Sequence, residues 1–123
     1  MTNEQALENE IQAKGLNAPR LTPADIDAAI VDEVYFTAAE ATAHDRAMSL
    51  TTYNAIRTLT FCVLVLRNGF TVTGESACAS PENFDPEIGR KIARENARNK
   101  IWQLEGYLLK QRLHDASDLE IEF

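Results

Sequence analysis

Two closely spaced helix starts in the sequence bring together residue types that bind anions and aromatic bases. Ser-Pro at 80–81 and Asp-Pro at 85–86 each pair a helix-capping residue with Pro in the first turn. Helix N-termini expose backbone N–H groups that bind anions. Asn83 and Phe84 stand between the two starts. Because a ring can stack on a base and an amide can bond its edge, this segment predicts a pocket for a small nucleotide.

The cationic side chains for such a pocket come from the predicted long helix and from one strand. Residues 61–115 hold seven acids and eight bases, whereas residues 1–60 hold nine acids and four bases. Arginine side chains in this more basic region are suited to holding phosphate. The candidate ligand-binding residues are Arg57, Asn83, Phe84, Arg94, Asn96 and Arg112.

These assignments have simpler alternatives. The Phe84 ring equally fits a hydrophobic plug where the connecting loop meets the core. At least some of the arginines on the long helix fit a solvated face better, with Glu87 and Glu95 as local partners. Arg57 is a weak signal by itself. Both interpretations stay open at the level of sequence.

Catalytic and metal-binding motifs fit this sequence poorly. Residues 74–78 lack the last Gly of a nucleophile elbow, and the chain has no Gly-rich phosphate loop. A zinc site would draw on residues without CxxC or HxxxH spacing, namely Cys62, Cys78, His44 and His114. His114 is better interpreted as a solvated residue near a helix end. We therefore expect a binding protein and no enzyme, with no cofactor and no metal.

The composition is that of one small acidic globular domain. The 123 residues include 12 Lys+Arg and 19 Asp+Glu, which gives a net charge of −7, and 45% are hydrophobic. A protein that coats nucleic acid or binds an anionic membrane needs clustered Lys and Arg, so we expect neither DNA nor membrane as a partner. The first ten residues are acidic and have no apolar core, which predicts no export signal and free thiols in a reducing cytoplasm.

Local patterns in the first part of the chain predict two short helices and a strand. The first helix covers about residues 4–14 in an N-terminal segment 1–20 and ends at Gly15. The second helix follows an N-cap at Thr22, has Pro23 in its first position and runs to Ile30. A strand begins near Val34.

A β-hairpin is the clearest local prediction. Residues 37–56 are rich in Ala and Thr and give no clear assignment. Residues 59–66 and 70–73 then form two β-rich runs around an Asn-Gly pair at 68–69, which predicts a hairpin with a type I′ turn. The first run is apolar on both faces. We expect a helix to cover one face and a neighbouring subunit to cover the other.

A long helix follows the hairpin. Apolar residues recur at three- and four-residue steps from Ile88 to Leu108, which predicts a helix that ends near Leu113. The tail, residues 115–123, is either disordered or an edge strand for a partner. The predicted fold is α+β in a single domain over residues 1–123: an antiparallel hairpin or meander sheet packs on the long C-terminal helix, with short N-terminal helices and a core at 57–113.

Several long motifs lie between Thr60 and Leu109. They are NGF, VTGESACASP and NFD, followed by EIGRKIA, KIW and LEGYLL. With these motifs the chain resembles a family of small tailed-phage proteins of the Thoeris anti-defence 1 type. The resemblance covers about the last two-thirds of the chain, and runs of this length do not arise by chance. The N-terminal third lies outside it.

The resemblance implies a phage anti-defence protein that acts as a sponge. Such a protein binds a cyclic ADP-ribose isomer, the immune signal of a bacterial TIR-domain enzyme, and does not degrade it. The resemblance also implies a homo-oligomer, dimer or hexamer, with signal pockets at subunit contacts, and a place in the host bacterial cytoplasm. Some members hold cyclic oligonucleotides in separate sites. The alternative is a phage protein that inhibits a host protein by direct binding.

For a ligand of this kind we expect a division of roles among the candidate residues. Phe84 would stack on the adenine, and Asn83 and Asn96 would bond the base or the ribose. Three arginines would neutralise the pyrophosphate, namely Arg57, Arg94 and Arg112.

Overall fold

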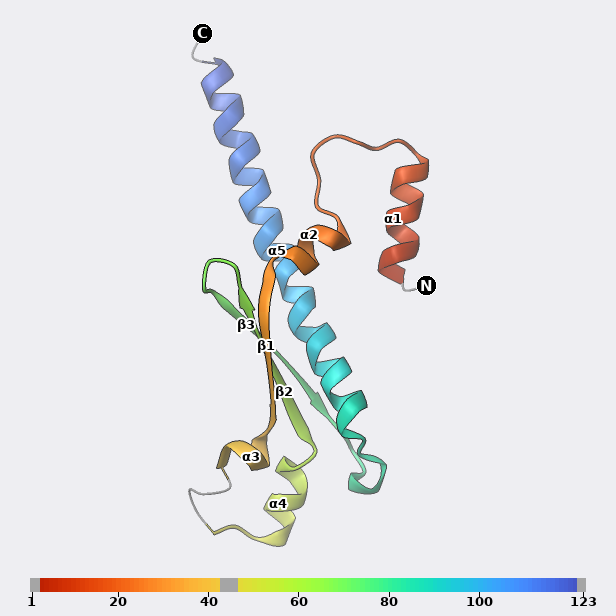
Figure 1. The fold of residues 1–123 in the computed structure, drawn as a ribbon, viewed down its shortest axis with the longest axis vertical. Coiled ribbons are helices and arrows are strands. Elements are labelled where there is room, and N and C mark those ends of the chain that lie inside the picture. Colours follow the sequence, from red (N-terminus) through yellow and green to blue (C-terminus); the bar gives the residue numbers. More distant parts are fainter. Residues whose placement is uncertain (1–2, 43–46, 122–123) are drawn as a thin grey trace. The chain divides into compact units, whose positions relative to one another are not determined.

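The computed structural model describes residues 3–42 and 47–121 and has an α+β fold (Figure 1). The chain divides into two compact units, one formed by residues 1–29 and 101–123 and the other by residues 30–100. The prediction of one domain stays a prediction, and each unit is described by itself. The elements are α1 (Asn3–Ala13), α2 (Pro23–Ala28), β1 (Ile30–Thr37), α3 (Ala38–Thr42), α4 (Leu50–Ile56), β2 (Leu59–Leu66), β3 (Thr71–Ala77), the 3-10 helix η1 (Pro81–Asn83) and α5 (Pro86–Ile121).

A three-stranded antiparallel sheet organises the second unit. The strand order is β1-β2-β3, so that Tyr35 of β1 lies opposite Cys62 of β2, and Cys62 lies opposite Gly74 of β3. Burial alternates along β2, as the period of two in a strand requires. The buried face packs on the first part of α5, where Ala93 and Ala97 have no exposed surface (Figure 1). The predicted sheet on a long helix is confirmed.

Gly74 is the residue that allows this sheet and this helix to approach each other. A Cβ atom at Gly74 would overlap the carbonyl oxygen of Ala93 and the amide nitrogen of Ala97, and would lie 2.9 Å from the Cα of Ala97. These are backbone atoms of α5, which cannot move aside as the end of a flexible side chain can. Glycine in a strand interior often marks such a close approach of two backbones.

The predicted hairpin is confirmed, but its turn differs from the type I′ expectation. Gly69 has a φ of 87°, and no residue other than glycine has a positive φ within the described ranges. A type I′ turn would require a positive φ at Asn68 as well. Instead, Gly69 N–H donates to the Leu66 carbonyl, and Leu66 N–H donates to the Phe70 carbonyl, both at 2.8 Å. This is the longer hairpin loop, in which a left-handed glycine ends the turn.

The segment without a sequence-based assignment contains two short helices, α3 and α4. The hydroxyl of Ser49 accepts a hydrogen bond from the Thr52 N–H at 3.1 Å and so caps α4. Upstream, the helix predicted to run from Pro23 to Ile30 ends at Ala28. The strand begins at Ile30 and not at Val34, because pairing with β2 extends the extended conformation back to that residue.

Helix α5 continues past Leu113, where it was expected to end, and reaches Ile121. Residues 115–121 are therefore helical and do not form the edge strand proposed for the tail, whose residues 122–123 lie outside the described part of the chain. No Gly or Pro follows Gly106 in the chain, so no strong helix breaker interrupts this segment. Across the described residues, no helix combines the length and the hydropathy that crossing a membrane requires.

In the first unit, Ile26 of α2 and Ile101 of α5 are fully buried. The Thr22 hydroxyl accepts a hydrogen bond from the Asp25 N–H at 3.2 Å, which confirms the predicted start of α2. The indole N–H of Trp102 donates to the Glu4 carboxylate at 3.2 Å.

Candidate functional site

A pocket of about 390 Å³ lies in the second unit. It is formed by the end of β1, the two short helices α3 and α4, the start of β2 and the segment that leads into α5. Its lining combines aromatic rings with two arginines and one carboxylate, a combination that suits a ligand with both a flat ring and a negative charge. The lining residues are Tyr35, Phe36, Thr37, Ala39, Glu40, Tyr53, Arg57, Thr60, Phe84, Pro86 and Arg90.

The two arginines of the pocket have donors to offer to a ligand. The Nε–H of Arg57 donates to the Asn54 side-chain oxygen at 3.1 Å, which orients the guanidinium group. Among the described residues, neither the remaining N–H groups of Arg57 nor any N–H group of Arg90 has a hydrogen-bond partner. The carboxylate of Glu40 accepts a hydrogen bond from the Thr37 backbone N–H at 3.4 Å. The described residues of the lining therefore carry a net positive charge.

Two lining residues of the pocket, Phe84 and Thr60, lie next to Gly89 of α5. A Cβ atom at Gly89 would lie 2.9 Å from the Thr60 hydroxyl oxygen and 3.4 Å from Cε1 of Phe84, so the missing side chain makes room for both. The Thr60 hydroxyl is buried and has no hydrogen-bond partner in the described part of the chain. Phe84 also lines a smaller pocket of about 120 Å³. The Phe84 ring therefore packs next to the buried Thr60 and Gly89 and also lines both pockets.

Two of the six predicted ligand-binding residues, Arg57 and Phe84, come together in the larger pocket. Asn83 is the last residue of η1 and lines the smaller neighbouring pocket. Arg112 is exposed, belongs to the first unit and is not among the residues that line either of these pockets. The sequence-based set is therefore only partly assembled in this chain.

The other two predicted residues, Arg94 and Asn96, make contacts to the sheet. Arg94 binds the Glu33 carboxylate of β1 through two hydrogen bonds, from Nε at 3.0 Å and from Nη2 at 3.1 Å. Asn96 donates from its amide to the Glu75 carbonyl of β3 at 2.9 Å. In this state, both side chains hold the first part of α5 on the sheet.

Sequence reasoning missed two important lining residues, Arg90 and Tyr53. A signal for Arg90 existed, because it follows Pro86 by one helical turn and so shares a helix face with it. No signal existed for Tyr53, which lies in the segment that gave no periodic pattern. The simpler interpretation of the basic helix face applies to Lys91, which pairs with Glu87 at 3.4 Å.

Tyr35 connects the pocket wall to a polar network. Its hydroxyl donates to the Glu33 carboxylate at 2.6 Å. Burial and this hydrogen bond raise the pKa of the Tyr35 phenol. Hydrogen bonds from Arg94, and then from Tyr35, hold the pKa of Glu33 below its ordinary value. Burial raises the pKa of the Cys62 thiol, so this thiol stays protonated and is not a nucleophile near neutral pH.

The Glu33–Arg94 contact predicts a specific pH dependence of stability. Since the pKa of Glu33 is lower in the folded protein than in the unfolded chain, its contribution is fully present above the ordinary value of 4.5 and is lost as the pH falls through the folded value. We expect Glu33→Gln to lower the free energy of unfolding by at most about 1 kcal/mol at neutral pH, because the pair is partly exposed. Urea unfolding should show this deficit shrinking below about pH 4.

The control for this experiment is Glu87→Gln, which removes the exposed ion pair between Glu87 and Lys91. Both residues belong to α5, the helix that also carries Arg94. Its deficit should be smaller than that of Glu33→Gln at neutral pH, because exposed pairs within one helix contribute only about 0.3–0.5 kcal/mol. A deficit of Glu33→Gln that stays constant down to pH 3 would contradict the role given to this contact.

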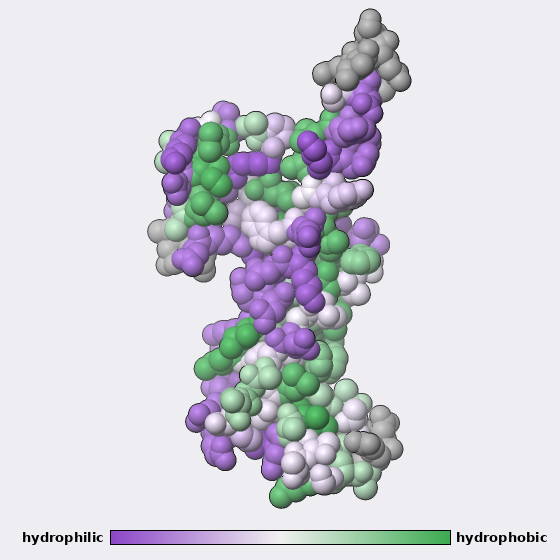
Figure 2. Space-filling model, turned by 180° about the vertical axis from the view of Figure 1, so that it is seen from behind, coloured by the Kyte–Doolittle hydropathy of each residue, from purple (hydrophilic) through white to green (hydrophobic). Residues whose placement is uncertain are grey.

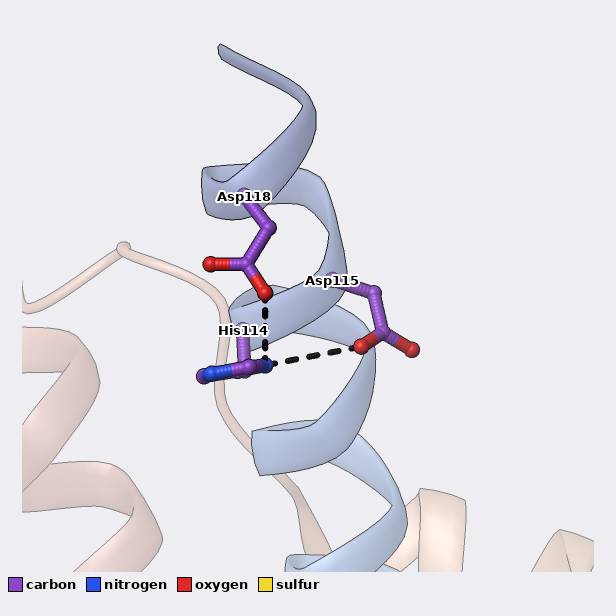
Figure 3. Close-up of side chains that lie close together, drawn as sticks. All are labelled: His114, Asp115 and Asp118. Atoms are coloured by element: carbon purple, nitrogen blue, oxygen red, sulfur yellow. Dashed lines mark hydrogen bonds and ion pairs between the residues drawn. The ribbon is translucent and has the colours of Figure 1, made fainter. Parts of the chain in front are cut away.

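A cluster of potential metal ligands lies near the end of α5 (Figure 3). The His114 Nδ1 atom is 3.5 Å from an Asp115 carboxylate oxygen and 3.4 Å from one of Asp118. All three side chains are exposed and come from one helix, an arrangement that is common without any ion. No ligand group within the described residues includes Cys62 or Cys78, and His44 lies outside these residues.

Comparison with known proteins identifies a family. Residues 21–113 match the model of a phage protein family described as N4 Gp49/phage Sf6 gene 66. The match begins well before the motifs that carried the sequence-based resemblance, so it includes part of the N-terminal third. No curated protein and no solved structure matches the chain.

Proposed function

We propose that this protein, which belongs to the phage protein (N4 Gp49/phage Sf6 gene 66) family, is a sponge for a cyclic ADP-ribose isomer. It binds the signal in the pocket of the second unit, does not degrade it, and so blocks immune signalling in the host bacterial cytoplasm. The observation that carries the proposal is the lining of this pocket, in which aromatic rings stand beside Arg57 and Arg90. The motifs at Thr60 to Leu109 supply the ligand class.

The lining suggests a role for each main contact. Phe84 stacks on the adenine ring. Arg90 and the terminal N–H groups of Arg57, which bind no described residue, hold the pyrophosphate. Asn83 stands next to Phe84 in sequence and bonds the base or the ribose. A volume of about 390 Å³ is within the range of small-molecule sites.

A sponge needs tight binding of the ground state and no added stabilisation of a transition state. The groups at the pocket suit this task. The phenol of Tyr35 has a raised pKa and is bonded to Glu33, which makes it a poor general base at neutral pH. Glu40 accepts a hydrogen bond from the Thr37 backbone. We therefore propose that the protein is no enzyme and needs no cofactor.

The same proposal includes a homo-oligomer. The face of the sheet opposite α5 carries Phe36, Phe61 and Val63, which are only partly buried, and the two Phe rings stack at a centroid distance of 5.5 Å. A second copy that covers this face buries apolar surface. Signal pockets at subunit contacts also give a role to Arg112, which would enter the pocket from a second copy and bind phosphate there. A separate site for cyclic oligonucleotides is part of the same resemblance.

The test separates sequestration from hydrolysis. Excess protein is incubated with purified cyclic ADP-ribose isomers, and the filtrate is chromatographed before and after heat denaturation. We expect the isomer to disappear from the first filtrate and to return intact in the second, because a sponge releases its ligand unchanged when it unfolds. The stoichiometry of loss gives the number of sites per chain.

Two outcomes would contradict the proposal. Return of a linear product would make the protein a hydrolase. Failure of every isomer to disappear would remove this ligand, and the alternative, direct inhibition of a host protein, would become the first hypothesis.

A further inference from the structure

The first unit contains a second pocket of about 380 Å³, with a lining quite different from that of the nucleotide pocket. It lies among α1, the segment that leads into α2, and the residue Trp102 of α5. Five of its lining side chains are apolar, namely Leu7, Ile11, Leu21, Pro23 and Trp102. A pocket of this composition gains free energy when it buries an apolar side chain of a partner.

The charged side chains that line this pocket in the described part of the chain are two carboxylates, Glu4 and Glu8, and Arg20 pairs with Glu8. Both carboxylates are held in position. Glu8 is 6% exposed and accepts hydrogen bonds from Arg20 at 2.6 and 2.8 Å and from Gln12 at 2.7 Å. Glu4 accepts the hydrogen bond of the Trp102 indole at 3.2 Å. Arg20 therefore compensates the charge of Glu8, and the hydrogen bonds fix both carboxylates in position.

The whole first unit is strongly acidic. Residues 1–29 and 101–123 hold ten Asp+Glu and four Lys+Arg, which gives −6 of the chain's net charge of −7. The second unit, residues 30–100, holds nine acids and eight bases and is nearly neutral. An acidic field of this kind attracts cationic partners and repels anionic ones, nucleotides included.

We propose that this pocket docks a basic segment of another protein, which inserts an apolar or aromatic anchor side chain flanked by Lys or Arg. The anchor packs on Leu7 and on the ring of Trp102, and the flanking cations face Glu4 and the surrounding acidic residues. Leu7 is 58% exposed, so most of its apolar side chain is in contact with water. Figure 2 shows a hydrophobic band over α1 with hydrophilic residues on its sides, which is the pattern of an apolar anchor site with a polar rim. This site is independent of the proposed nucleotide pocket.

Trp102 makes the site directly measurable, because it is the single Trp of the chain. The probe is a synthetic peptide in which a central Leu-Phe pair is flanked on each side by two Lys. We expect a saturable change in Trp102 fluorescence when this peptide is titrated into the full chain. Two control peptides, one with Glu in place of Lys and one with Ser-Ser in place of Leu-Phe, should give no saturable change.

Two matched variants locate the binding site. Leu7→Lys places a cation in the pocket, whereas Leu16→Lys makes the same change at a residue that is 57% exposed and does not line the pocket. We expect Leu7→Lys to weaken peptide binding at least about tenfold and Leu16→Lys to leave it within about twofold. Leu7→Gln removes the apolar side chain without changing the charge, and Gln has a high helix propensity, so this variant tests the apolar contact alone. Thermal unfolding checks that the variants fold.

Three outcomes would overturn the proposal. Absence of saturable binding by the basic peptide removes the site. Equal loss in Leu7→Lys and Leu16→Lys shows binding elsewhere through general charge. Binding of a small apolar amine such as phenethylamine as tightly as the peptide makes the pocket a small-molecule site and not a protein-docking site.

Discussion

Gly74→Ala is expected to destabilise the second unit by about 3 kcal/mol, at the upper end of the usual cost of overpacking a core. The new methyl group would collide with backbone atoms of Ala93 and Ala97. Relief of this collision requires a shift of α5 away from the sheet. Such a shift would also lengthen the hydrogen bonds from Arg94 and Asn96 to the strands. Urea unfolding monitored by circular dichroism measures the loss.

The matched control is Gly106→Ala, the same substitution at another glycine of this chain. At Gly106 the nearest heavy atom to a new Cβ is the Leu21 Cδ1 at 3.9 Å, an ordinary van der Waals distance. Since Gly in a helix interior costs about 0.5–1 kcal/mol relative to Ala, this variant should be slightly more stable than the wild type. A Gly74→Ala protein as stable as the wild type would show that the sheet and α5 are not in this close contact.

Phe84→Ala is expected to weaken binding of the cyclic ADP-ribose isomer about thirtyfold, which corresponds to loss of a hot-spot side chain. The ring offers the adenine a flat apolar surface inside a pocket, and alanine leaves that surface empty. Isothermal titration calorimetry with the isomer that the wild type removes from solution gives the affinity. Phe70→Ala is the control, because Phe70 is 56% exposed and does not line the pocket.

The arginines of the pocket give a second series for the same prediction. Arg57→Ala and Arg90→Ala should each weaken binding about tenfold, because charge-assisted hydrogen bonds to a pyrophosphate are lost. Arg67→Ala is the control for removal of a positive charge, because Arg67 is exposed at the hairpin turn and does not line the pocket. A comparable loss in Arg112→Ala would support supply of this side chain by a second copy. Unchanged affinity in both Phe84→Ala and Arg57→Ala would show that the ligand binds elsewhere.

The structure also separates the two interpretations that the sequence leaves open for the basic helix face. Arg94 has a structural contact with Glu33, and Lys91 has a local partner. Arg90 alone among these three lines the larger pocket. Binding experiments with Arg94→Ala therefore need the unfolding data beside them, because this change also removes a contact between α5 and β1.

The sequence by itself determined the local elements with strong periodicity. Alternation over residues 59–66 and the Asn-Gly pair predict the hairpin, and apolar steps of three and four residues predict α5. These predictions succeed because backbone geometry ties side-chain spacing to burial within one element. The end of α5 and the turn type were wrong, since both depend on small differences between conformations that the same residues tolerate.

The tertiary structure decided which side chains meet. Arg94 pairs with Glu33, which is 61 residues away in sequence, and Trp102 pairs with Glu4, 98 residues away. Similarly, the pocket joins Phe84 to Arg57 and to Tyr53, a residue without any local signal. Contacts of this kind depend on how distant segments pack, and local propensity does not encode that packing. The sequence therefore indicated a segment that contributes to the pocket, whereas the packing of the sheet, α4 and α5 selected the residues that line it.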